Sequence, residues 1–302
     1  MKKNRLLGVM LILLLLLPAA ALARDVAPIV STAPIVSTAW LEQNLANPGV
    51  VVLDVRKVEE YKAGHIPKSV NVFYGSWAIK KGELLNELPP SDELMDVIGG
   101  AGIDENTIVV VVGKTDKMPD QFDMTRVAWT LKYMGVPHVA ILNGGINQWM
   151  KDKKPLSTEA VKPKSKAFKG KINRGLYVNK DYVMSRLGKA IILDTRGPAF
   201  YQGKEKLPFV PKVGRIKGAV NLPVGQLYTS EGLYKKEADL SALAIAAVGN
   251  DKTKEIIAYC DTGKTCTSWA FVLTELFGYK DVKIYDGSSM EWLKDPNAPF
   301  EP

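Results

Sequence analysis

The residues best suited to covalent chemistry in this sequence are two cysteines, Cys260 and Cys266, which lie six positions apart. Cys260 follows the segment 255–259, which is apolar after Glu255 and predicts a buried strand, and a helical pattern begins just after Cys266. A tight loop between a strand and a helix directs several backbone N–H groups toward the side chain at the strand end. Such a setting lowers the pKa of a thiol, and Lys264 adds a nearby positive charge. The segment therefore predicts one activated sulfur nucleophile, Cys260.

The scarcity of cysteine and histidine limits the other chemistry that this chain can perform. Two of its 302 residues are cysteine and two are histidine, which excludes a four-cysteine zinc site and a disulfide scaffold. No ligand spacing suggests a metal or an organic cofactor, and we predict neither. With 46% hydrophobic and 24% charged residues, the composition is that of a globular protein long enough for two domains.

Other roles for the cysteine loop follow from its residue pattern. A Cys-x5-Arg phosphatase has its phosphate-binding arginine where Cys266 stands, so that class of enzyme is disfavoured. Residues 263–265 match the end of a nucleotide-binding P-loop, but the glycine that this motif needs five places earlier is Ala258. Two roles remain open for Cys266. One is a structural or reversible disulfide with Cys260, which requires Cα atoms within about 7 Å, and the other is simple packing on the helix.

An internal repeat divides the chain into two halves. Four blocks recur in the same order, about 140 to 150 residues apart. The matched pairs are residues 50–56 with 190–196, 64–72 with 214–222, 108–112 with 255–259, and 142–149 with 285–292. This long period indicates tandem domains and not a solenoid of short repeats. In the first half, Gly113 stands at the position that Cys260 has in the second.

Within each half, short β-branched runs alternate with helical patterns. Consecutive apolar positions, as in residues 50–55 and 108–112, are typical of parallel strands that are covered on both faces. The helical stretches 125–134 and 267–277 each end at a glycine, Gly135 and Gly278. We therefore predict an α/β fold in which each of two domains is a parallel sheet with helices on both faces.

The predicted boundaries place an extended lead-in at residues 24–39, the first domain at 40–150, a linker at 151–170 and the second domain at 171–302. The linker contains seven lysines and two prolines, which predicts a solvated connector. No arginine or aromatic pattern accompanies these lysines, so we expect no nucleic-acid partner.

The N-terminus has the layout of a secretory signal peptide over residues 1–23. Three basic residues precede an apolar run at 6–17, and small residues up to Ala23 form a cleavage site. Cleavage after Ala23 lowers the formal net charge from +8 to +5. We expect a periplasmic or secreted protein that has no membrane association after cleavage. A retained membrane anchor is the alternative.

Two Leu-Asp-x-Arg segments, the turns Gly-His-Ile-Pro and Gly-Arg-Ile-Lys, and the cysteine loop make this chain similar to the tandem-domain rhodanese family of sulfurtransferases. The resemblance extends from about Trp40 to Trp292 and implies two rhodanese-like domains, of which only the second is catalytic. It implies that Cys260 takes a sulfane sulfur from a small anionic donor (thiosulfate, 3-mercaptopyruvate or polysulfide) and forms a persulfide. The sulfur then passes to a thiol or cyanide acceptor, and a protein acceptor fits the same chemistry.

The resemblance also implies substrate-binding residues. The loop keeps the family pattern Cys-x-x-Gly-x-Thr, and the residues assigned to substrate binding are Asp261, Thr262, Gly263, Lys264 and Thr265, with Arg215 and His65 as further candidates. Phe200 stands where the larger family members have an arginine that binds the anionic substrate, so a lysine or Arg215 would have to supply that charge. This departure leaves the donor open. It also favours an alternative function, a sulfur-binding or relay protein with little turnover of small donors.

Overall fold

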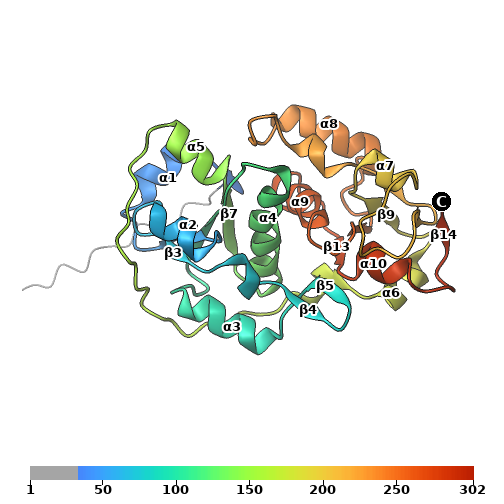
Figure 1. Cartoon of the computed structure of the whole chain (residues 1–302), viewed down its shortest axis with the longest axis horizontal. Coiled ribbons are helices and arrows are strands. Elements are labelled where there is room, and N and C mark those ends of the chain that lie inside the picture. Colours follow the sequence, from blue (N-terminus) through green and yellow to red (C-terminus); the bar gives the residue numbers. More distant parts are fainter. Residues whose placement is uncertain (1–32) are drawn as a thin grey trace, which may run out of the picture. The chain divides into compact units, whose positions relative to one another are not determined.

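The structure is a computed structural model that describes residues 33–302 (Figure 1). The predicted signal peptide, residues 1–23, and its cleavage site lie outside the described residues. Within 33–302, no helix combines the length and the apolar character needed to cross a membrane.

The first half of the chain forms a five-stranded sheet in which all neighbouring strands are parallel. In spatial order the strands are β1 (Ile35–Val36), β7 (His138–Leu142), β6 (Ile108–Val112), β2 (Val50–Asp54) and β3 (Val70–Asn71). The central strand β6 has the sequence Ile-Val-Val-Val-Val, and each of its residues is buried. Branched side chains of this kind pack well on both faces of a covered sheet.

Helices cover both faces of this sheet. Val109 and Val111 of β6 lie in one hydrophobic cluster with α3 and α4, whereas Val110 and Val112 lie in another with α1 and α5. The split follows from the alternation of side chains along a strand. The helices of this half are α1 (Thr38–Asn44), α2 (Val58–Ala63), α3 (Ser91–Gly100), α4 (Met118–Tyr133) and α5 (Gly145–Lys151), with a 3-10 turn η1 (Tyr74–Ser76).

The second half repeats this arrangement. Its sheet is again five-stranded and parallel, in the order β11 (Val220–Asn221), β9 (Ile191–Asp194), β12 (Ile256–Tyr259), β13 (Val282–Tyr285) and β8 (Tyr177–Val178). Read from β8 to β11, this is the order of β1 to β3 in the first sheet. The predicted α/β fold with two tandem domains is therefore confirmed.

Helices cover the second sheet on both faces too. Ile256 and Ala258 of β12 lie in the hydrophobic cluster that includes α8 and α9, and Ile257 and Tyr259 lie in the cluster that includes α6 and α10. The elements are α6 (Lys180–Arg186), α7 (Pro198–Tyr201), α8 (Glu237–Val248), α9 (Cys266–Phe271) and α10 (Ser288–Trp292), with the 3-10 turns η2 (Arg174–Leu176) and η3 (Val224–Leu227). A π-helical turn, η4 (Val272–Leu276), continues α9 as far as the glycine Gly278, which has a φ of 70°.

The two domains share one hydrophobic cluster, because α4 of the first domain packs against α9 of the second (Figure 1). At this contact the hydroxyls of Thr125 and Ser268 are hydrogen-bonded at 2.8 Å and buried. Since α9 begins at Cys266, the packing brings the first domain against the cysteine loop.

Two short antiparallel pairs complete the fold. The strands β4 (Ile79–Lys81) and β5 (Leu84–Glu87) form a hairpin in the first domain. The strands β10 (Arg215–Ile216) and β14 (Phe300–Glu301) bring the end of the chain back to the second domain.

The structure differs from the predicted boundaries at two points. Ile35 and Val36, expected in the lead-in, pair with Ile141 and Leu142 and so add an edge strand to the first sheet. The linker 151–170 is not fully solvated, because Phe168 is buried in the shared hydrophobic cluster. The lysine-rich composition concealed this contact, since a single apolar residue among many charges gives no periodic signal.

Candidate active site

Cys260 lies at the carboxyl end of β12, the central strand of the second sheet, and only 1% of its surface is exposed. The loop after it ends at Cys266, where α9 begins. The backbone N–H groups of Cys260 and Gly263 both donate to the hydroxyl of Ser288, at 3.1 and 2.9 Å, and that hydroxyl donates to the carbonyl of Tyr285. One serine side chain therefore ties both halves of the loop to the end of β13.

Gly263 is required by the close approach of the loop to Asp286. Its φ is 70°, and a Cβ at this position would lie 2.1 Å from the Asp286 carboxylate oxygen Oδ1. A side chain here would therefore meet both backbone strain and a steric clash.

A fully buried ion pair between the two domains fixes this approach. Arg126, on α4, donates hydrogen bonds to both carboxylate oxygens of Asp286, at 2.5 and 3.0 Å. The same guanidinium donates to the carbonyls of Gly263 at 2.9 Å and Asn86 at 2.6 Å. One arginine of the first domain thus binds the loop, the end of β13 and the hairpin strand β5.

Three further side chains of the first domain contact the loop: Asn86, Asp123 and Tyr74. The Asn86 amide donates to the Thr262 hydroxyl at 2.8 Å and accepts a hydrogen bond from the Tyr74 hydroxyl at 3.0 Å. The Lys264 ammonium pairs with Asp123 and lies over the Tyr74 ring, 4.4 Å from the ring centroid. The only lysine of the loop is therefore already engaged by a carboxylate and an aromatic face.

The surroundings of Cys260 favour its thiolate. Burial by itself raises the pKa of Cys260, but hydrogen bonds from the Cys266 thiol, the Thr265 hydroxyl and the backbone N–H groups of Thr262 and Cys266 outweigh it and lower the pKa to about 5. Burial, and then the neighbouring Cys260, raise the pKa of Cys266 well above its ordinary value. These surroundings therefore favour the thiolate form of Cys260 and the protonated form of Cys266, and both are free cysteines.

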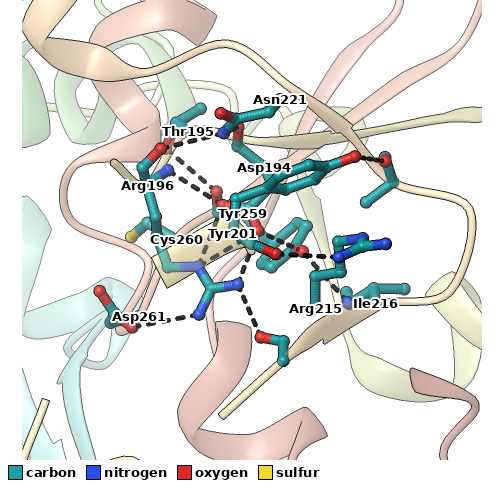
Figure 2. A network of polar contacts seen from close by, with 12 residues as sticks. Asp194, Thr195, Arg196, Tyr201, Arg215, Ile216, Asn221, Tyr259, Cys260 and Asp261 are labelled. Atoms are coloured by element: carbon teal, nitrogen blue, oxygen red, sulfur yellow. Dashed lines mark hydrogen bonds and ion pairs between the residues drawn. The ribbon is translucent and has the colours of Figure 1, made fainter. Parts of the chain in front are cut away.

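Asp261, which follows Cys260 in the chain, forms an ion pair with a buried arginine (Figure 2). Arg196 donates to both oxygens of Asp194, at distances from 2.7 to 3.2 Å, and to the Gly214 carbonyl at 2.9 Å. Its remaining terminal nitrogen Nη1 lies 3.7 Å from Oδ1 of Asp261. Burial, together with the charge of Cys260, raises the pKa of Asp261 to about 7, although Arg196 opposes this shift. The cation that Asp261 contacts, Arg196, is therefore already paired with Asp194.

The structure brings the five predicted loop residues around Cys260, but it sets Arg215 and His65 in other contacts. Arg215 pairs with Glu301 at 2.8 Å and lies over the Tyr201 ring. His65 is fully buried in the first domain, stacked on Tyr61, whose carbonyl lies 2.9 Å from its Nδ1. A carbonyl only accepts, so Nδ1 carries the hydrogen. Neither side chain has a hydrogen bond or ion pair to the loop among those of residues 33–302.

Five residues that hold the loop were not identified from the sequence: Asn86, Asp123, Arg126, Asp286 and Ser288. The repeat contained a signal for the last of them. Ser288 is the counterpart of Gly145, and both have a left-handed backbone, with φ of 49° and 54°. A serine in place of a glycine at such a strained position indicates that its hydroxyl has a structural or functional role. Across the described chain, no group of three or more His, Cys, Asp or Glu side chains is arranged to hold a metal ion.

Comparison with known proteins gives two matches to one domain family. The family model described as a rhodanese-like domain matches residues 37–152 and 179–295. The chain is 31% identical to a thiosulfate sulfurtransferase of Bos taurus over 275 residues, which cover 86% of this chain and 91% of the relative. It is 30% identical to the sulfur carrier protein TtuD of Thermus thermophilus over 273 residues, which cover 85% and 93%.

A solved structure shows the same architecture over nearly its full length. The 3-mercaptopyruvate sulfotransferase SseA from Escherichia coli superposes with a TM-score of 0.73 at 26% sequence identity. The match covers 85% of this chain and 99% of that one.

Proposed function

This chain belongs to the rhodanese family of sulfurtransferases, and we propose that it carries a sulfane sulfur as a persulfide on Cys260. The observation that carries this proposal is the buried Cys260 thiol, whose pKa is lowered to about 5 by the hydrogen bonds of its own loop. At neutral pH this residue is a thiolate, the nucleophilic form of cysteine.

The reaction divides into two displacements. In the first, the Cys260 thiolate attacks the sulfane sulfur of the donor, the bond that held this sulfur breaks, and its electron pair leaves with the rest of the donor. In the second, a thiol or cyanide acceptor attacks the outer sulfur of the persulfide, and the Cys260 thiolate leaves. Storage of the group on the protein between the two steps predicts ping-pong kinetics.

The loop is suited to hold the persulfide anion. Its donors are backbone N–H groups and short side chains, which stabilise a diffuse negative charge without crowding a second sulfur atom. The first domain has Gly113 at the equivalent strand end and no thiol, so it takes no part as a sulfur carrier. We assign it the task of holding the loop through Arg126, Asn86 and Asp123.

The direct test replaces each cysteine in turn. Cys260→Ser abolishes thiocyanate formation from a sulfur donor and cyanide, because the hydroxyl neither ionises nor forms a persulfide. Cys266→Ser is the matched control, since it lies on the same loop and retains much of the activity. Thiocyanate formation by purified Cys260→Ser at a rate near that of the wild type would refute the role of Cys260.

A carrier function is the second candidate, and Phe200 favours it. An apolar ring stands where the larger relatives have an anion-binding arginine, so small anionic donors have no bidentate partner at that position. Side-by-side rates with several donors discriminate the two functions. A carrier loads sulfur on Cys260 but shows no saturable turnover with any small donor.

We further propose that the protein is exported and that residues 1–23 are removed after Ala23. The basic start, the apolar run and the small residues at the cleavage site support this. Fractionation of the producing cells, with N-terminal sequencing of the purified protein, tests it. A protein that retains Met1 in the membrane fraction would favour the anchor instead.

A further inference from the structure

Resting on the proposed role of Cys260, we propose that Asp261 makes the site selective for small hydropersulfides, R–S–SH, over oxyanion donors such as thiosulfate. The inference rests on the charges that surround Cys260. Binding of a dianion requires cations that are not already paired with carboxylates.

Each cation that contacts the loop within residues 33–302 is already paired with a carboxylate. Arg126 is bound to Asp286, and both side chains are fully buried. Arg196 is bound to Asp194, and these two are also almost fully buried. Lys264, the only cation that the loop itself supplies, is paired with Asp123. The loop therefore offers an incoming dianion no cation that is not already neutralised.

Asp261 adds a carboxyl group next to Cys260, and this group carries a negative charge above its pKa of about 7. Its side chain is 16% exposed, and its only cationic partner within residues 33–302 is Arg196, at 3.7 Å. In the same part of the chain its Oδ1 has no hydrogen-bond partner, and it is shielded from solvent. The repulsion between Asp261 and the Cys260 thiolate is strong enough to contribute to the raised pKa of this carboxyl group. A donor with two negative charges meets the same repulsion in addition to that from the thiolate.

The leaving groups of the two donor classes differ in charge. When Cys260 attacks thiosulfate, the S–S bond breaks and sulfite leaves with the bonding electron pair and two negative charges, which call for neighbouring cations. When Cys260 attacks the terminal sulfur of R–S–SH, the S–S bond breaks and R–S⁻ leaves with the electron pair and takes a proton from water. The products are Cys260–S–SH, R–SH and hydroxide. The leaving group R–S⁻ therefore carries one negative charge fewer than sulfite as it departs beside Asp261.

The burial of Cys260 limits the size of the donor. With 1% of its surface exposed and the first domain bound to the loop through Asn86 and Arg126, the thiolate is out of reach of a thiol on the surface of another folded protein. The donor class that fits is a persulfide of a low-molecular-weight thiol.

The test compares kcat/KM for 2-hydroxyethyl hydropersulfide, whose R group is uncharged, and for thiosulfate in the wild type and in Asp261→Asn, at pH 8, where Asp261 is ionised. We expect the wild type to favour the persulfide, and the ratio of thiosulfate to persulfide kcat/KM to rise about tenfold in Asp261→Asn. A ratio is the chosen readout because a general loss of structure lowers both rates together. Asp239→Asn, on the exposed side of α8, removes one carboxylate away from the loop and leaves the ratio unchanged.

A second variant keeps the inference testable if Asp261→Asn does not fold. Asp123→Asn leaves Lys264 without its carboxylate partner, so it also raises the ratio in favour of thiosulfate. A ratio that stays within about twofold of the wild type in the folded variants overturns the inference. So does a wild-type enzyme that uses thiosulfate as well as the persulfide.

Mass spectrometry of Cys260 separates this failure from failure of the proposed function. If neither donor adds a sulfur atom to Cys260, the persulfide mechanism is wrong. If both donors load Cys260 equally well in the wild type, the mechanism stands and only the role of Asp261 as a selector is wrong.

Discussion

Arg126 of the first domain donates a hydrogen bond of 2.9 Å to the carbonyl oxygen of Gly263, in the middle of the loop that follows Cys260. The same guanidinium neutralises Asp286, which leaves no room for a side chain at Gly263. The domain without a thiol therefore completes the site of the domain that has one. This relationship gives a physical reason for two covalently linked domains, because the loop after Cys260 is partly held by Arg126, which is 137 residues away from Gly263 in the sequence.

Arg126→Met tests this role through stability. The substitution leaves Asp286 as an unpaired buried charge, so we expect the free energy of unfolding to fall by about 3–5 kcal/mol. Denaturant unfolding measures this change. The additional substitution Asp286→Asn removes the stranded charge and should recover part of the loss.

The matched control is another ion pair between the two domains that lies on the surface. Glu83 and Lys294 are 74% and 63% exposed, so Lys294→Met should cost only about 0–1 kcal/mol. Equal losses in Arg126→Met and Lys294→Met would contradict the structural role of Arg126.

The cysteine loop and the residues that hold it differ in how far they could be predicted from the sequence. Cys260 and its loop were predictable because strand, tight turn and helix are adjacent in the chain, and local patterns report on adjacent residues. Arg126 and Asn86 were not, because their contacts with Gly263 and Thr262 depend on how the first domain packs against the second. Asp286 and Ser288 could be predicted in part. They lie within the repeat, where comparison with Asn143 and Gly145 marks them as changed, but their contacts with the loop come from the parallel pairing of β12 and β13.

Cys266→Ala should raise the pKa of Cys260. The Cys266 thiol donates to the Cys260 thiolate and is one of the groups that lower its pKa to about 5. Removal of one such donor raises the pKa by about one unit, so the thiolate is lost at a higher pH as the solution is acidified. The ultraviolet absorbance of the thiolate as a function of pH measures the midpoint.

Cys266→Ser is the comparison variant, because its hydroxyl still donates and should produce a smaller shift. Cys266 does not interfere in the wild type, since its own pKa lies well above the ordinary value. An unchanged midpoint in Cys266→Ala would show that the thiol is only a packing group, the other role that the sequence left open.

At position 288, glycine should give a more stable protein than alanine, which is the reverse of the usual order of these two residues. The φ of 49° at Ser288 strains a residue that has a Cβ, while the Ser288 hydroxyl accepts hydrogen bonds from the N–H groups of Cys260 and Gly263. Ser288→Ala loses these hydrogen bonds, each worth about 1 kcal/mol, and keeps the strain. Ser288→Gly loses the same hydrogen bonds but relieves about 1 kcal/mol of strain.

We therefore expect Ser288→Gly to be the more stable of the two variants in denaturant unfolding, and both to turn over more slowly than the wild type because the loop has lost its anchor. The counterpart of Ser288 in the first domain, Gly145, has a similar backbone without a hydroxyl. If Ser288→Ala were as stable as Ser288→Gly, the strain assigned to this position would be wrong.

Glu87→Gln should stabilise the protein at high pH and not at low pH. Burial, and then the charge of Asp286, raise the pKa of Glu87 from an ordinary 4.5 to about 7, against the opposing effect of Arg126. The folded protein therefore holds this proton more tightly than the unfolded chain. Stability from this group is fully present below about pH 4.5 and is lost as the pH rises through about 7.

Glutamine keeps the shape of Glu87 and cannot ionise. Above pH 7 we therefore expect the free energy of unfolding of Glu87→Gln to exceed that of the wild type by an amount on the order of 2 kcal/mol. Unfolding curves at pH 5 and pH 8 measure the difference, with Glu93→Gln on the exposed face of α3 as the control. Because other buried carboxyls contribute equally to both proteins, the difference between variant and wild type isolates Glu87, and a gain of the same size at both pH values would contradict the assignment.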